Sequence, residues 1–269
     1  MLKHRLIPVL LIKNGRLVKS LRFKNCKYVG DPINAVRIFN EKEVDELIVL
    51  DIAASKEGAE PDFGLIEEFA SECFMPLAYG GGIKTVEQAD RLFGLGVEKV
   101  CLQTAVLEDL SLVTTFANRY GSQSVVVSVD VKRNLVGRLK LYSASFERTL
   151  PQPWLQFAFQ AQQAGAGEIL INAVHQDGTM KGPDLSMITE AANSLSVPLI
   201  AVGGISSFGD IKNAVNAGAS AIGAGAYFVF QGPHRAVLIT YPNSEDLDKL
   251  FRKSDNTTLV TSEKTQIRS

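Results

Sequence analysis

PLIAVGGISSFGDIKNAVNAGASAIGAGAY, residues 198–227, contains two glycine-rich turns, each placed directly after a short apolar segment. The pattern predicts a buried strand at 199–202, a helix, and a second strand at 219–222. Glycine leaves the backbone N–H groups at both strand ends uncovered by any Cβ, and such a concave patch suits a phosphate. Two of these turns after successive strands are typical of strands seven and eight of a (β/α)₈ barrel. Tight turns without a ligand are the structural alternative.

The first half of the chain repeats this pattern at a shift of 122 residues. The shift lays Pro76, Leu77, Gly81, Gly82, Ile83 and Gly96 onto Pro198, Leu199, Gly203, Gly204, Ile205 and Gly218. The repeat predicts one (β/α)₈ TIM barrel at residues 1–250, built from similar (βα)₄ halves at about 1–122 and 123–240. Because each half carries a Gly-Gly turn, we expect a ligand with two phosphates at opposite ends. Residues 251–269 lack periodicity and predict a loosely ordered tail.

Composition and charge exclude several classes of protein. The 269 residues are 46% hydrophobic, enough for one barrel of about 250 residues. The net charge of −1 gives no basis for nucleic-acid binding. The apolar run at 6–12 is too short for a membrane span or a secretion signal, and three scattered cysteines fit a reduced cytoplasmic protein. Three histidines without a neighbouring cysteine group support neither a metal site nor a cofactor.

Eight apolar segments are expected as strands, each followed by a helix. They lie at 5–12, 46–52, 76–79, 99–103, 124–131, 168–173, 199–202 and 219–222. Asp51 and Asp130 stand near the C-terminal ends of their segments, where a barrel carries its functional groups. A helix cap or loop anchor is the alternative role for Asp51. Asp31 and Pro32 predict the start of the first helix, and a single helix is expected from Thr104 to Tyr120.

Three polar connections follow expected strands. Residues 13–27 carry six basic side chains and no acidic one, which indicates either a solvated loop face or a mobile cationic lid that closes over an anionic substrate. Residues 54–61 are expected as a polar loop, and residues 138–145 as part of a hairpin. A further polar loop after the sixth strand contains Asp177, Gly178 and Thr179.

Short motifs occur in order along the chain: LVKSLRFKN (17–25), GDP (30–32), DEL and LDIAAS (within 45–55), GGGI (80–83), GSQ and VDVKR (within 121–133), GAGEIL (165–170), DGT (177–179) and GGI (203–205). With these motifs the chain resembles, over residues 1–240, the cyclase subunit of imidazole glycerol phosphate synthase from histidine biosynthesis. The match covers most of the chain, and the ordered set of motifs is specific.

The resemblance implies a two-subunit reaction. In that family a glutaminase subunit docks on the N-terminal face of the barrel and releases ammonia. The ammonia crosses the barrel core to a bis-phosphate phosphoribulosyl formimino carboxamide nucleotide; imidazole glycerol phosphate forms, and an aminoimidazole carboxamide nucleotide leaves. The residues that the resemblance assigns to the substrate and its phosphates are Lys19, Asp51, Gly82, Thr104, Asp177, Gly178, Gly203, Ala224 and Gly225, with Asp130 as a catalytic residue.

The resemblance also implies a charged gate at the floor of the barrel, formed by Arg5, Glu46, Lys99 and Glu168. All four residues stand at expected strand starts. Charges at the bottom of an apolar barrel are costly unless they are paired, and two cations with two anions allow that pairing. Four unrelated surface charges are the alternative.

The expected catalytic face departs from the family pattern. Two aspartates, after strands one and five, act in the family as general acid and general base. Asp130 matches the second, but Leu11 stands at the position of the first, and loss of a positioned acid or base typically costs about 10² to 10⁴ in rate. Further departures are Val9, Ala53, Gln103, Asn172 and Gly225.

Three functions remain open. The chain is a working cyclase in which Asp130 and other groups suffice, or a paralogue that passes ammonia to an amidotransferase making acetamidino sugars for surface polysaccharides such as lipopolysaccharide. The third alternative is a non-catalytic scaffold for a glutaminase. The gate residues together with Leu11 favour a glutaminase-coupled ammonia-transfer subunit with impaired cyclase activity.

Overall fold

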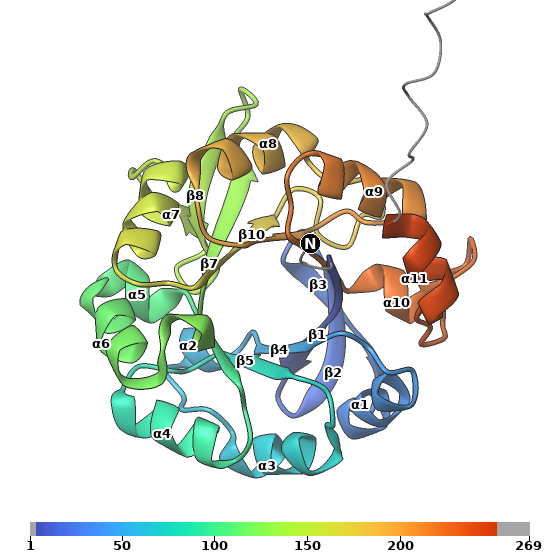
Figure 1. The fold of residues 1–269 in the computed structure, drawn as a ribbon, viewed down its shortest axis with the longest axis horizontal. Helices are drawn as coiled ribbons and strands as arrows, with labels where there is room; N and C mark the ends of the chain where they lie inside the picture. Colours follow the sequence, from blue (N-terminus) through green and yellow to red (C-terminus); the bar gives the residue numbers. More distant parts are fainter. Residues whose placement is uncertain (1–3, 252–269) are drawn as a thin grey trace, which may run out of the picture.

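Eight parallel strands close into a barrel in the computed structural model, which describes residues 4–251 (Figure 1). In order around the barrel they are β1 (Arg5–Lys13), β4 (Leu47–Asp51), β5 (Leu77–Gly80), β6 (Lys99–Leu102), β7 (Val125–Arg133), β10 (Glu168–Ala173), β11 (Leu199–Val202) and β12 (Ala221–Ala224). β12 pairs with β1 and closes the sheet. The (β/α)₈ fold expected from the glycine turns is therefore confirmed.

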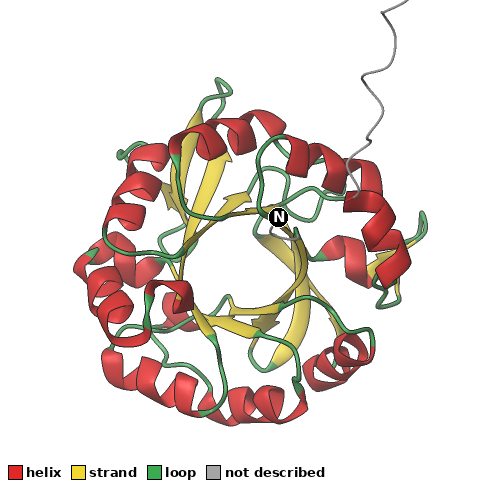
Figure 2. Cartoon of the chain, in the orientation of Figure 1, coloured by secondary structure: helices red, strands yellow, loops and turns green. Residues whose placement is uncertain are grey.

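Helices cover the outer face of the barrel (Figure 2). They are α1 (Pro32–Glu41), α3 (Phe63–Glu72), α4 (Val86–Gly94), α6 (Ser111–Tyr120), α7 (Trp154–Gln163), α8 (Leu185–Ser194), α9 (Phe208–Asn216) and α11 (Ser244–Phe251). Local signals determine where they begin. Asp31 caps α1 by accepting a hydrogen bond from the N–H of Asn34, with Pro32 at the first helical position, as expected. Thr85 forms a capping box with Gln88 at the start of α4.

The barrel has an inner and an outer hydrophobic core because strand side chains alternate between its two faces. The outer core, between strands and helices, contains large side chains such as Phe39, Phe69 and Phe116. The inner core is a separate buried cluster made by Ile7, Val9, Ile48, Ala78, Cys101, Val126, Leu170, Ile200 and Ala221. This cluster, here called the inner layer, lies between the strand starts and the strand ends.

The single helix expected from Thr104 to Tyr120 is wrong. The chain forms α5 (Thr104–Glu108) and then α6, with Asp109 in an extended conformation between them. The Asp109 carboxylate accepts hydrogen bonds from the N–H and the hydroxyl of Ser111, at 3.0 and 2.7 Å. Aspartate competes in this way for backbone donors, which favours a turn over a helix interior.

Residues 13–27 form a hairpin rather than a loop. Its strands are β2 (Arg16–Leu21) and β3 (Lys24–Gly30), and β2 pairs antiparallel with β1. Five of the six basic side chains are exposed, whereas that of Lys19 is buried. The sequence does not predict these strands because charged residues interrupt the alternation of apolar and polar side chains that identifies a half-buried strand.

Smaller elements complete the two ends of the barrel. They are α2 (Ala54–Glu57), η1 (Ser122–Ser124), β8 (Leu139–Ser143), β9 (Arg148–Thr149), α10 (Ala226–Val229), β13 (Phe230–Gln231) and β14 (Ala236–Val237). β8 pairs with β7 in the expected hairpin, whereas α2 occupies part of the expected loop 54–61. Of the expected tail 251–269, Phe251 ends α11 and residues 252–269 lie outside the described residues. Within residues 4–251 no helix has the length and apolar character to cross a membrane.

Candidate active site

The carboxyl ends of the strands surround a cavity of about 500 Å³. Seven of the residues expected at the substrate line it: Lys19, Asp51, Thr104, Asp130, Asp177, Gly178 and Gly225. Gly82, Gly203 and Ala224 do not line the cavity, although Gly82 and Gly203 belong to the turns that follow strands of the same end. The fold therefore brings most of the expected site together at the functional end of the barrel.

The Gly-Gly turns have a backbone conformation that favours glycine. Gly82 has φ of +74° and Gly203 of +108°, both in the region that L side chains rarely adopt. A Cβ on Gly203 would lie 2.9 Å from the carbonyl oxygen of Ala173, and one on Gly82 would lie 2.7 Å from that of Ala59. Close backbone packing thus accounts for these glycines, and their binding of phosphate stays a prediction.

Lys19 reaches from β2 into the barrel. Its ammonium donates a hydrogen bond to the carbonyl oxygen of Val9, and burial lowers the pKa of Lys19 to about 8, against a raising effect of Asp177. A Cβ on Gly225 would stand 2.7 Å from the Lys19 Nζ. The glycine at this position therefore leaves the space that the ammonium occupies.

Asp177 connects the β2–β3 hairpin to the loop after β10. Its carboxylate accepts hydrogen bonds from the Ser20 hydroxyl at 2.7 Å and from the Phe23 N–H at 3.3 Å, and its carbonyl accepts one from the Arg22 N–H at 3.0 Å. Burial raises the pKa of Asp177, while the bonds from Ser20 and Phe23 oppose the rise. These contacts place the hairpin beside the cavity.

Asp130 lies near the end of β7, four strands away from β1 and thus on the opposite side of the barrel. Burial raises the pKa of its carboxyl to about 7; a hydrogen bond from the Gln103 side-chain amide opposes this shift and the charge of Asp177 adds to it. A carboxyl with such a pKa can give or take a proton near neutrality. Leu11 lines the same cavity from β1 and offers no titratable group.

Two other expected residues have local partners. The Asp51 carboxylate accepts hydrogen bonds from the N–H groups of Ala53 and Ala54 at 2.9 and 3.1 Å, which anchors the start of α2. This is the loop-anchor role, although Asp51 also lines the cavity. The Thr104 hydroxyl shares a hydrogen bond of 2.8 Å with that of Ser145.

Ser20, Ser145 and Tyr142 also line the cavity and were not identified from the sequence. The sequence offers only their position as a clue: Ser20 follows Lys19 in the basic segment, and the other two belong to the expected hairpin. Single hydroxyl groups carry no spacing pattern of their own, so only the fold shows that they face the cavity.

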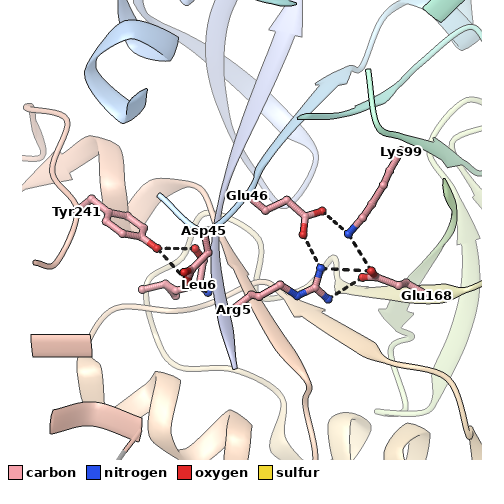
Figure 3. Close-up of polar contacts among 7 residues, drawn as sticks. All are labelled: Arg5, Leu6, Asp45, Glu46, Lys99, Glu168 and Tyr241. Atoms are coloured by element: carbon pink, nitrogen blue, oxygen red, sulfur yellow. Dashed lines mark hydrogen bonds and ion pairs between the residues drawn. The ribbon is translucent and has the colours of Figure 1, made fainter. Parts of the chain in front are cut away.

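The four expected gate residues form a closed ion-pair network at the opposite end of the barrel (Figure 3). Lys99 Nζ lies 2.9 Å from Glu46 Oε1 and 2.8 Å from Glu168 Oε1, and Arg5 Nη2 lies 2.8 Å from Glu168 Oε2. Arg5 also bonds to Glu46. The Glu46 side chain is only 2% exposed. These residues are therefore paired with one another and are not unrelated surface charges.

The electrostatics of this network, here called the floor ring, agree with its geometry. Burial disfavours the ionised form of Glu168, but hydrogen bonds from Arg5 and Lys99 outweigh that effect and lower the pKa of Glu168. Two cations and two anions leave the ring neutral. Beside it, the hydroxyl of Tyr241 donates to the Leu6 carbonyl oxygen at 2.8 Å and lies near Asp45 (Figure 3).

The fold and the partly polar cavity at the carboxyl ends of the strands place the chain among α/β-barrel proteins with a site suited to a small-molecule ligand. The chain belongs to the family described as histidine biosynthesis protein, whose family model matches residues 5–233. The resemblance found in the sequence is therefore confirmed.

Relatives of nearly full length support this assignment. The chain is 50% identical over 249 residues to the Pseudomonas aeruginosa protein named "Putative imidazole glycerol phosphate synthase subunit hisF2", covering 92% of this chain and 99% of that protein. It is 46% identical over 256 residues to a Leptospira interrogans protein named "Putative imidazole glycerol phosphate synthase subunit HisF", with 93% and 100% covered. It is 37% identical over 226 residues to "Imidazole glycerol phosphate synthase subunit HisF" of Streptomyces coelicolor, with 84% and 90% covered.

Proposed function

We propose that this chain is the barrel subunit of a cytoplasmic glutaminase-coupled complex and conducts ammonia from its floor ring to the cavity at the other end. The observation that carries the proposal is the alignment of the floor ring, the inner layer and the cavity along the interior of one barrel. A glutaminase on the N-terminal face, in a heterodimer, would release ammonia next to the floor ring. An apolar passage favours neutral ammonia over ammonium because an unpaired charge is costly there.

The substrate in this proposal is the one that the sequence resemblance implies. A bis-phosphate formimino nucleotide would place one phosphate near Gly82 and Thr104 and the other near Gly178, Gly203, Ala224 and Gly225, with Lys19 beside it. Asp130 would exchange protons as ammonia adds and the imidazole ring closes, because its pKa lies near neutrality. The products would be imidazole glycerol phosphate and an aminoimidazole carboxamide nucleotide, in a lyase-type reaction.

Leu11 favours a second candidate. Since Leu11 stands where the resemblance expects a carboxylate on β1, cyclisation would lack one of its two aspartates, and ammonia delivery would be the remaining activity. The acceptor would then be the substrate of an amidotransferase that makes acetamidino sugars for surface polysaccharides. Ammonia transfer is thus the function that we favour, with impaired cyclase activity. A scaffold that carries no ammonia is the third alternative.

The first experiment measures turnover of the formimino nucleotide by the purified chain at high ammonium and alkaline pH, without glutaminase, beside Leu11→Asp. We expect little turnover by the unmodified chain and a gain by the variant. Full turnover by the unmodified chain would show that the β1 carboxylate is dispensable and would remove the argument for impaired activity.

The second experiment blocks the inner layer in the complex with glutaminase. Ala78, in the inner layer, is replaced by Phe, and exposed Ala236→Phe is the matched control. We expect Ala78→Phe to form glutamate from glutamine while product falls, and added ammonium to restore product through the open cavity. Equal product from both variants would refute ammonia transfer and favour the scaffold. Ala221→Leu is a second blocking variant in case the Phe side chain prevents folding.

A further inference from the structure

Polar side chains from neighbouring strands meet directly above the inner layer. Asn172 on β10 and Asp130 on β7 are paired in the strand register, and their exposed fractions are only 8% and 5%. Gln103, which follows β6, donates its side-chain amide to Asp130 from the other side. All three residues line the cavity. We call Gln103, Asp130 and Asn172 the polar cluster.

One atom of the polar cluster has no partner. The side-chain oxygen of Asn172 is buried and accepts no hydrogen bond from residues 4–251. A buried acceptor without a donor is destabilising, so its presence favours a ligand that donates a hydrogen bond. Asn172 and Gln103 also depart from the pattern of the family that the sequence resembles, whereas Asp130 matches it.

The cluster is aligned with the floor ring. On β10 the inward residues are Glu168, Leu170 and Asn172, and β6 with its following residue presents Lys99, Cys101 and Gln103 in the same order. Each series therefore runs from a ring residue through one residue of the inner layer to a polar side chain. Four residues of strand span about 13 Å at about 3.3 Å per residue. Along β10 and β6 the first polar side chains after the ring are therefore those of Asn172 and Gln103, and β7 places Ser128 beside Leu170, one step before Asp130.

We propose that the polar cluster is a binding site for ammonia or ammonium at the exit of the inner layer. The inference rests on the proposed ammonia transfer and specifies where the transferred molecule is held. The Asn172 oxygen and the Asp130 carboxyl accept N–H hydrogen bonds, and the protonated Asp130 carboxyl can donate to the ammonia lone pair. Proton transfer within this pair turns ammonia and a carboxyl group into ammonium and a carboxylate, and its reversal restores the nucleophile.

The test is a titration of the ¹⁵N-labelled full chain, followed by NMR at the side-chain amides of Gln103 and Asn172. We expect ammonium chloride to shift both resonances saturably, and sodium chloride at equal ionic strength to leave them unchanged. Asn172→Leu should abolish the saturable shift at Gln103, whereas Asn213→Leu, on the exposed face of α9, should retain it. Equal responses to both salts, or an unchanged response in Asn172→Leu, would overturn the proposal.

The second measurement is product formation by the complex with glutaminase as a function of added ammonium, for whichever product that complex forms. Loss of one buried hydrogen-bond partner, worth about 1.4 kcal/mol, predicts an about tenfold higher half-saturating ammonium concentration in Asn172→Leu, with glutamine hydrolysis unchanged. An unchanged half-saturating concentration would refute the site. If Ala78→Phe blocks product while ammonium fails to bind the cluster, the holding site is refuted and ammonia transfer still stands. If Ala78→Phe has no effect, ammonia transfer itself is refuted.

Discussion

Lys99→Met tests whether the floor ring is an electrostatic unit. The substitution keeps an apolar stem of similar length and removes one cation, so the ring charge changes from zero to −1. Glu46, only 2% exposed, and Glu168 each lose one of their two cationic partners. Removing one partner of a buried ion pair typically costs 3–5 kcal/mol. We expect the free energy of unfolding to fall by about 3 kcal/mol, the lower end of that range, because Arg5 still bonds to both carboxylates.

The loss is measured by urea unfolding and by thermal unfolding, where about 3 kcal/mol corresponds to a melting temperature lower by about 6–12 °C in a domain of this size. Lys56→Met is the matched control, because it breaks the exposed Lys56–Glu147 pair and should leave the melting temperature unchanged. In the complex with glutaminase, Lys99→Met should also reduce product formed per glutamine hydrolysed.

A double variant separates charge balance from packing. Lys99→Met combined with Glu168→Gln leaves one cation and one anion, Arg5 and Glu46, so the ring is neutral again. The double variant should lose at least about 1 kcal/mol less than the sum of the single losses. Strict additivity, or a Lys99→Met loss below about 1 kcal/mol, would refute the view that the ring is a mutually dependent network.

Two more predictions concern the cavity. The raised pKa of Asp130, about 7 against 3.8, means that the folded chain binds more protons than the unfolded chain between these values, so its stability falls as pH rises through that range. Asp130→Asn should remove this fall and, relative to the unmodified chain, gain up to about 4 kcal/mol in urea unfolding between pH 4 and pH 8; parallel pH profiles would contradict it. Gly225→Ser adds a Cβ 2.7 Å from the Lys19 Nζ and should displace the ammonium toward water. The pKa of Lys19, followed by ¹³C NMR at its Cε, should then rise from about 8 toward 10.5; an unchanged pKa would show that Gly225 does not control its position.

Residues that act on their near neighbours could be predicted from the sequence. The apolar strands and the Asp31–Pro32 helix start depend on patterns within a few positions along the chain, and they occur within about two residues of where they were expected. The Gly-Gly turns also occur where they were expected, although the backbone that requires glycine there belongs to the more distant Ala59 and Ala173. Where a local competitor was overlooked, as with Asp109, the expected helix boundary was wrong. The loop expected at 13–27 is wrong for a related reason: the strand β2 forms because it pairs with β1, and its own sequence shows no alternation of apolar and polar residues.

By itself, the sequence determined the eight-strand barrel, the end that carries the functional groups, and the set of four charges at strand starts. Only the tertiary structure decided how those groups are paired. Arg5 and Glu168 meet across 163 residues of chain, and Gln103 reaches Asp130 from the end of the neighbouring strand β6. The Lys19 ammonium likewise lies in its buried position because Gly225 has no side chain to occupy that space. Barrel closure brings distant residues to hydrogen-bonding distance and removes them from water, and both pairing and pKa depend on that environment.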